Sequence, residues 1–161
     1  MTLTAWMDDN LATQGYALPA SERRRLAIGL RFPTALCFGL VTAGVVLESA
    51  ILLAALSVLG LIAGFGARHP FDYVWNHGAR HLLRAPGVPP NPTRRRHAFK
   101  VGTAWLLVVA GLFTAGWSTA GLVLGGMLLA ACGSLTVFNL CIPSLALSLL
   151  ERRRLREAVT A

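Results

Sequence analysis

Asn139, Cys141 and Ser144, together with Pro143, lie within a long apolar stretch near the C-terminus. Proline has no backbone N–H, so in a continuous helix Pro143 would leave the carbonyl of Asn139 without its usual donor. Such a carbonyl is tolerated inside a membrane only where it faces protein or water. The segment therefore predicts a polar site at a helix kink, with Cys141 as a redox thiol or soft-metal ligand, especially if Cys37 packs nearby. In the competing interpretation, the kink is packing, Asn139 bonds to a neighbouring helix and Cys141 is a small apolar filler.

All four histidines lie between the two longest apolar stretches of the chain. His77 and His81 are four residues apart, a spacing that places both on one helical face and can chelate a metal ion. His69 lies two turns before His77, and Asp72 is close enough in sequence to share the site. Alternatively, the histidines are polar groups of a basic helix at a membrane surface. The spacing thus indicates a candidate metal site formed by His69, Asp72, His77 and His81.

The composition is that of an integral membrane protein. Of 161 residues, 55% are hydrophobic, more than a soluble domain of this length can bury. Fifteen Lys and Arg stand against seven Asp and Glu, and the basic residues border the apolar stretches. This placement suits contacts with anionic headgroups, and we expect no nucleic-acid binding. The three cysteines lie inside apolar stretches without CxxC spacing, so no disulfide framework is expected.

Two apolar stretches are each too long for a single span. Residues 32–67 contain one charged residue, Glu48, and as one helix would reach roughly 54 Å across a hydrocarbon core about 30 Å thick. Residues 101–150 contain no Asp, Glu, Lys, Arg or His, and a turn is expected at residues 116–119. We therefore predict an all-α membrane protein with four transmembrane helices arranged as two hairpins. The expected spans are about 31–47, 50–67, 98–115 and 120–149.

The basic residues also predict an orientation. Four precede the first span, seven lie between the second and third spans, four follow the last span, and neither hairpin turn contains any. Cytoplasmic loops carry the excess of Lys and Arg, so both termini and the middle loop are expected in the cytoplasm, with the chain as a multi-pass protein of the plasma membrane. The chain then divides into a cytoplasmic N-terminal segment (1–30), a first hairpin (31–67), a cytoplasmic loop (68–97), a second hairpin (98–150) and a basic cytoplasmic tail (151–161).

The middle loop and the N-terminus contain shorter helical patterns. Over residues 70–84, Phe71, Trp75 and Leu82 fall on one face and polar residues on another, which predicts an amphipathic helix inserted in the cytoplasmic membrane interface. The proline-rich residues 85–92 are expected to be extended. The first twenty residues contain enough apolar side chains for a short interfacial helix but too few for a core.

Small residues predict close helix packing. Gly60 and Gly64 form one GxxxG pair, and Gly121 and Gly125 form another. Glycines at this spacing let two helix backbones approach closely, within one chain or between copies.

Several short motifs resemble one family. The chain contains ERRRL at 22–26, GLRF at 29–32, HPFD at 69–72, NHG at 76–78, PPNP at 89–92 and LCIPS at 140–144. Together they resemble bacterial proteins of domain-of-unknown-function family 4395, over about residues 20–150. The resemblance implies a small bacterial integral membrane protein with no assigned activity. Family members with a Cys-x-Gly-Cys element at the last motif would hold a second thiol, which Ser144 replaces here, so a dithiol redox role is weakened.

Three functions from different classes remain open. The first is a non-enzymatic structural or accessory module, favoured because the spans contain no acid, base or nucleotide motif. The second is a small oligomeric transporter or channel. The third is a membrane thiol or metal-binding protein using Cys141. We expect contact with anionic lipid headgroups and association with a second copy or another membrane protein, and we predict no cofactor.

Overall fold

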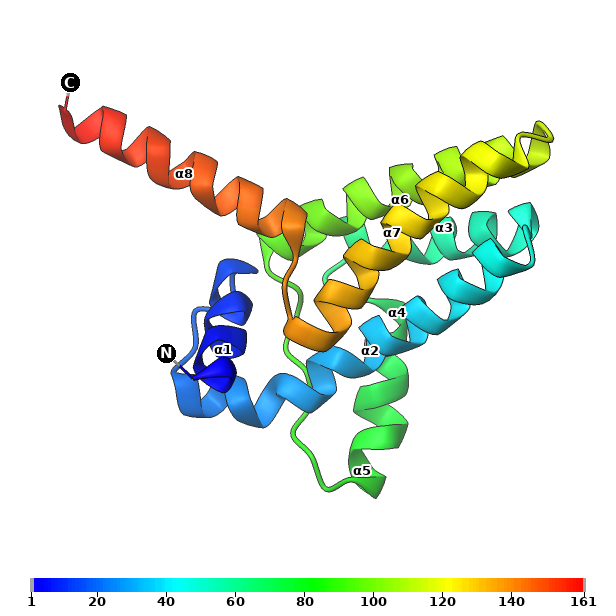
Figure 1. Cartoon of the computed structure of the whole chain (residues 1–161). Helices are drawn as coiled ribbons and strands as arrows, with labels where there is room; N and C mark the ends of the chain where they lie inside the picture. Colours follow the sequence, from blue (N-terminus) through cyan, green and yellow to red (C-terminus); the bar gives the residue numbers. More distant parts are fainter. Residues whose placement is uncertain (1, 161) are drawn as a thin grey trace.

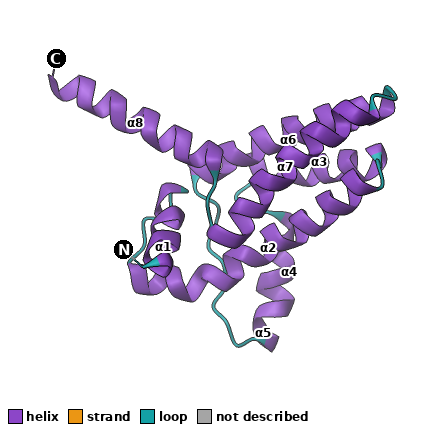
Figure 2. Cartoon of the chain, in the orientation of Figure 1, coloured by secondary structure: helices purple, strands orange, loops and turns teal. Residues whose placement is uncertain are grey.

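A computed structural model gives the structure of residues 2–160, apart from the side chains of Thr4, Asp8, Arg152 and residues 154–160. Every regular element in this part of the chain is a helix, as the fold class predicts (Figures 1 and 2). The helices are α1 (Leu3–Thr13), α2 (Ala20–Val46), α3 (Ala50–Phe65), α4 (Pro70–Val74), the π-helix η1 (Trp75–Ala79), α5 (Arg80–Leu82), α6 (Thr93–Thr114), α7 (Ser118–Phe138) and α8 (Ile142–Thr160).

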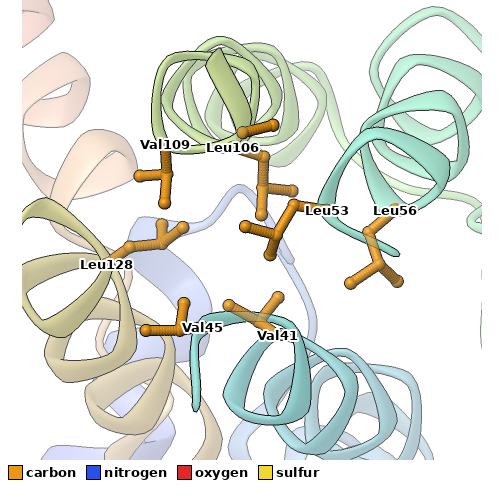
Figure 3. Close-up of a cluster of buried hydrophobic side chains, with 8 residues drawn as sticks. Val41, Val45, Leu53, Leu56, Leu106, Val109 and Leu128 are labelled. Carbon is orange, nitrogen blue, oxygen red and sulfur yellow. The ribbon is translucent and has the colours of Figure 1, made fainter. Parts of the chain in front are cut away.

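Helices α2, α3, α6 and α7 form a bundle, from which α5 and α8 point away (Figure 1). Its apolar centre combines side chains from all four helices (Figure 3), among them Val45, Leu53, Val109 and Leu128. The most extensive helix contacts join α3 to α6 and α2 to α7. The bundle is thus held mainly by contacts between the two predicted hairpins, and it does not consist of two separately packed hairpins.

Three helices, α2, α6 and α7, are long and apolar enough to cross a membrane. At 16 residues α3 meets this length only together with α4–α5, from which it is bent by 80°. The described chain thus has three candidate spans, or four if the bent pair counts as one. The predicted turns are confirmed, because α2 ends at Val46 before α3 begins, and α6 ends at Thr114 before α7 begins.

The glycine pairs confirm the predicted close approach. A Cβ added at Gly60 would clash with Oγ1 of Thr103 on α6, and one at Gly64 would lie 2.8 Å from the Lys100 side chain. A Cβ at Gly125 would lie 2.8 Å from Val45 on α2. Glycine is therefore required where α3 meets α6 and where α7 meets α2.

The prediction of one kinked helix over 120–149 is wrong. Helix α7 ends at Phe138, Asn139 is left-handed with φ of 54°, and α8 begins at Ile142. Asparagine adopts this conformation more readily than most residues, so it ends α7 at low cost. Pro143 lies in the first turn of α8, where a backbone N–H has no helical partner in any case. The proline therefore starts a new helix and does not bend an old one.

The helix predicted over 70–84 is present as Pro70–Leu82, but its lipid-facing side was assigned incorrectly. Trp75 is fully buried inside the protein, Phe71 is half-buried and only Leu82 is exposed. The Trp75 ring contacts Phe32 of α2, with ring centroids 5.3 Å apart. Residues 75–79 form a π-helical turn, which shifts the register, so the regular helical pattern no longer places Trp75 and Leu82 together.

Candidate functional site

The break between α7 and α8 is closed by side chains of the N-terminal segment. The carbonyl oxygen of Asn139 accepts a hydrogen bond of 2.7 Å from Nε2 of Gln14. The carbonyl of Phe138 accepts one of 3.0 Å from Nδ2 of Asn10. Oδ1 of Asn139 accepts one of 3.3 Å from Nε of Arg31. The sequence predicts that the Asn139 carbonyl faces protein or water. In the structure its donor is Gln14, which belongs to the N-terminal segment that has too few apolar side chains for a core of its own.

The predicted residues of the polar kink lie together, with Cys141 and Ser144 buried beside the break. The Ser144 hydroxyl donates to Sγ of Cys141 at 3.1 Å. The carbonyl of Leu140 accepts a hydrogen bond of 3.2 Å from the Ser134 hydroxyl of α7. The polar atoms of the break are thus paired within the protein, and the Cys141 thiol lies at the boundary between α7 and α8.

His69 and Asp72 cap the N-terminus of α4. The backbone N–H of His69 donates to Oδ2 of Asp72 at 2.7 Å, and Nδ1 of His69 accepts from the Phe71 N–H at 3.1 Å. Because Nδ1 is an acceptor, the ring proton lies on Nε2, which points at Sγ of Cys37, 3.5 Å away. Burial, and then the charge of Arg95, lowers the pKa of His69 to about 4, so the ring is neutral at pH 7.

The candidate metal residues are not brought together. His69 and Asp72 are buried and occupied by the cap, whereas His77 and His81 are exposed. His77 stacks on Tyr73, with ring centroids 6.2 Å apart, and Nε2 of His81 accepts from Nε of Arg80 at 3.3 Å. In the described part of the chain, no group of three or more His, Cys, Asp or Glu side chains is placed to hold a metal ion.

Arg95 joins distant segments through a buried polar network. Its Nη1 donates to the Tyr16 hydroxyl at 2.9 Å, and its Nη2 donates to the carbonyl of Leu30 at 3.4 Å. Tyr16 also donates to Oδ1 of Asn91 at 3.4 Å, and Nδ2 of Asn91 donates to Oδ2 of Asp72 at 3.4 Å. From the sequence alone, Arg95 is only one of the basic residues that indicate membrane orientation. In the structure its side chain is buried, with 3% of the residue exposed. No local pattern identifies it, because its partners lie on other elements.

A cavity of about 550 Å³, partly open to the outside of the protein, is bounded by α2, α3, α6, α7 and the start of α8. Most of its wall is apolar and includes Leu56, Leu106 and Leu128. All three cysteines also line it, namely Cys37, Cys132 and Cys141. The sequence analysis considered whether Cys37 packs near Cys141. Both residues line this cavity, and a contact between the two thiols stays a prediction.

The polar lining of the cavity includes Gln14, His69 and Arg95. Arg95 lies in the first turn of α6, and His69 follows the end of α3, so both belong to the end of the bundle opposite the interhelical turns. Among these lining residues, Nε of Arg95 and Oε1 of Gln14 are buried and have no hydrogen-bond partner. Oδ1 of Asp72 and Nε of Arg96 are also buried without a partner, but these two residues do not line the cavity. The cavity thus combines an apolar chamber with an unpaired donor and an unpaired acceptor.

A second, more open hollow of about 750 Å³ lies on the surface between the start of α2 and the segment 73–89. Arg25, Arg68 and Arg80 give it a basic lining. Its wall is held by Arg68, which donates to the carbonyl of Val88, and by Asn76, which bonds to both the N–H and the carbonyl of Val88. This hollow is a basic groove on the same side of the bundle as Arg95.

Comparison with known proteins identifies one family. The family model described as "Domain of unknown function (DUF4395)" matches residues 27–152, which is more than half of the chain. No curated protein matches the chain. No solved structure matches it either.

Proposed function

We propose that this chain, which belongs to the DUF4395 family, is a non-enzymatic accessory module of the bacterial inner membrane that binds an apolar molecule inside its bundle. The cavity carries this proposal. Its volume of about 550 Å³ falls within the range of roughly 300–1,000 Å³ typical of small-molecule sites. Such sites combine an apolar wall with a few convergent polar groups, and here Gln14, His69 and Arg95 supply those groups.

The proposal includes an orientation. The bundle crosses the membrane four times, with both termini and the segment 66–92 in the cytoplasm, because the Lys and Arg residues avoid the two interhelical turns. Exposed arginines then contact anionic headgroups. Reporter fusions at either terminus or after Pro90 should behave as cytoplasmic, and fusions at Glu48 or Ser118 as exported. A cytoplasmic reporter at Ser118 would contradict four spans.

Two glycines of α6 provide a matched test of the cavity. Gly102 lines it, and a Cβ added there meets no atom within 4 Å, so a large side chain at this position can enter the chamber. Gly111 on the same helix has equally open surroundings and is not part of the cavity lining. Gly102→Phe should therefore fill the chamber, whereas Gly111→Phe places the same ring outside it.

Native mass spectrometry of protein released from membranes in a mild detergent measures the bound molecule. The wild type and Gly111→Phe should carry an additional small-molecule mass, and Gly102→Phe should lose most of it. Equal occupancy of all three proteins, or none in the wild type, would contradict the proposal.

A second candidate is a membrane thiol protein, favoured by the contact between Nε2 of His69 and Sγ of Cys37. The Nε2–H of His69 would donate a hydrogen bond to a thiolate at Cys37, although burial disfavours that charge and a neutral ring protonated on Nε2 cannot remove the thiol proton. In a variant that retains only Cys37, an apolar maleimide should react faster than in the same variant with His69→Phe. Equal rates would exclude this second role.

A further inference from the structure

We infer that the molecule held in the cavity is a single-chain amphiphile with an acidic head, and that Arg95 binds the head while the tail lies along the apolar wall. The inference rests on the proposed function and adds the chemistry of the ligand. It starts from the two unpaired atoms at the polar end of the cavity.

Arg95 is a buried cation without an ion-pair partner in the described part of the chain. Two of its nitrogens donate to neutral oxygens, those of Tyr16 and Leu30, and its Nε donates to none. A buried charge is costly unless it is paired. A guanidinium binds carboxylate and phosphate oxygens better than any other side chain does. An acidic head in the cavity would supply both the missing charge and the missing acceptor.

Asp72 does not fill this role. Its Oδ2 accepts from the His69 N–H and from Asn91, and its Oδ1 is buried without a hydrogen-bond partner. Its charge interacts with that of Arg95, but the two side chains form no hydrogen bond. Burial raises the pKa of Asp72, so its environment disfavours the charged form that would balance a neighbouring cation. Nε of Arg95 thus has no acceptor within this network, and an acidic head in the cavity would supply one.

Gln14 points to the same end of the chamber. Its Nε2 is fixed by the carbonyl of Asn139, which leaves Oε1 as a buried acceptor without a donor. A hydroxyl or protonated oxygen on the head would satisfy it. The tail then extends past Leu106 and Leu128, whose side chains form the apolar wall. A cavity with one polar end and one apolar chamber matches a ligand with one polar head and one hydrocarbon chain.

The test uses delipidated full-length protein titrated in native mass spectrometry with three defined probes. Oleate offers a carboxylate, 1-oleoyl lysophosphatidic acid offers a phosphate and a hydroxyl, and mono-oleoylglycerol offers only neutral oxygens on the same chain. At least one acidic probe should bind tenfold or more tightly than mono-oleoylglycerol. The tighter of the two acids then identifies the head as carboxylate or phosphate.

Two variants assign the contact. Arg95→Gln should weaken binding of the acidic probe at least tenfold. Arg96→Gln should leave that binding unchanged, because it removes a neighbouring half-buried guanidinium that bonds to the Phe65 carbonyl and does not line the cavity. If Arg95→Gln fails to fold, the preference of the wild type for acidic over neutral probes still decides whether the cavity binds an acidic head. If all three probes bind equally and Gly102→Phe blocks their binding, the inference of an acidic head is wrong while the proposed function is still supported. Binding that Gly102→Phe leaves unchanged would overturn both.

Discussion

Gln14 donates a hydrogen bond of 2.7 Å to the carbonyl of Asn139, a residue 125 positions later in the chain. The bond joins the end of α1 to the break between α7 and α8 and closes one end of the cavity. Both residues are buried, so neither group has access to bulk water if the other is removed.

Gln14→Leu should therefore destabilise the protein, because it leaves the Asn139 carbonyl buried without a donor. The expected loss in the free energy of unfolding is about 1–3 kcal/mol. Thermal unfolding in detergent measures it, with Leu3→Ala, an exposed change on the same helix, as the control. Equal melting temperatures for the two variants would show that the bond contributes nothing.

Substitutions at Asn139 separate its backbone from its side chain. Glycine accepts the left-handed conformation and loses only the contact with Arg31, whereas alanine also bears a backbone cost of about 1–2 kcal/mol. Asn139→Ala should therefore melt at a lower temperature than Asn139→Gly. Pro143→Ala should have little effect, because Pro143 lies in the first turn of α8. A large effect of Pro143→Ala would instead favour one continuous, kinked helix.

The buried His69 should make stability depend on pH. Its pKa falls from 6.5 to about 4 on folding, so its contribution is complete above pH 6.5 and is lost as the pH falls toward 4. The loss amounts to roughly 3 kcal/mol. Asp72, with a pKa raised by burial, acts in the opposite direction, since its protonation at falling pH favours the folded state.

A matched variant isolates the histidine. In His69→Asn the side-chain oxygen still caps α4 while the titration is removed, and the contribution of Asp72 is retained. Unfolding followed between pH 7 and pH 4 should therefore show a smaller loss of stability in the variant than in the wild type. Parallel curves would mean that His69 is not buried in its neutral form.

Tryptophan fluorescence tests the placement of the loop helix. Trp75 is fully buried inside the protein, whereas Trp117, at the turn between α6 and α7, is 66% exposed. In liposomes with brominated lipids, a variant that retains only Trp117 should be quenched strongly and one that retains only Trp75 weakly. Stronger quenching of Trp75 than of Trp117 would instead indicate that the loop helix inserts Trp75 into the membrane interface.

The sequence predicted those features that depend on burial or charge along one helix. Glu48 identified a turn because an ionised carboxylate is unfavourable at the centre of a span. Gly60 and Gly64 identified a close helix contact because their spacing places both on one face. A functional role for Cys141 and Ser144, which are hydrogen-bonded to each other in the structure, stays a prediction.

Features that depend on distant partners were missed. Asn139 ends α7 where Gln14 and Arg31 meet it, and no local pattern indicates such partners. The π-helical turn at residues 75–79 changed which face of the loop helix is buried. Arg95 carries the same charge as the half-buried arginines on either side of it, and only the tertiary structure places it next to Tyr16.

Photocrosslinking in native membranes tests most directly whether the bundle holds an apolar molecule. A single-chain fatty acid with a diazirine in its tail should label the cavity residues Leu106 and Leu128 saturably, and excess unmodified fatty acid should abolish that labelling. Labelling at the outward-facing Val108 and Val123 should increase linearly and resist competition, since these side chains contact bulk lipid. Saturable labelling at Leu128 that Gly102→Phe removes is the predicted result. Labelling confined to Val108 and Val123 would contradict the account.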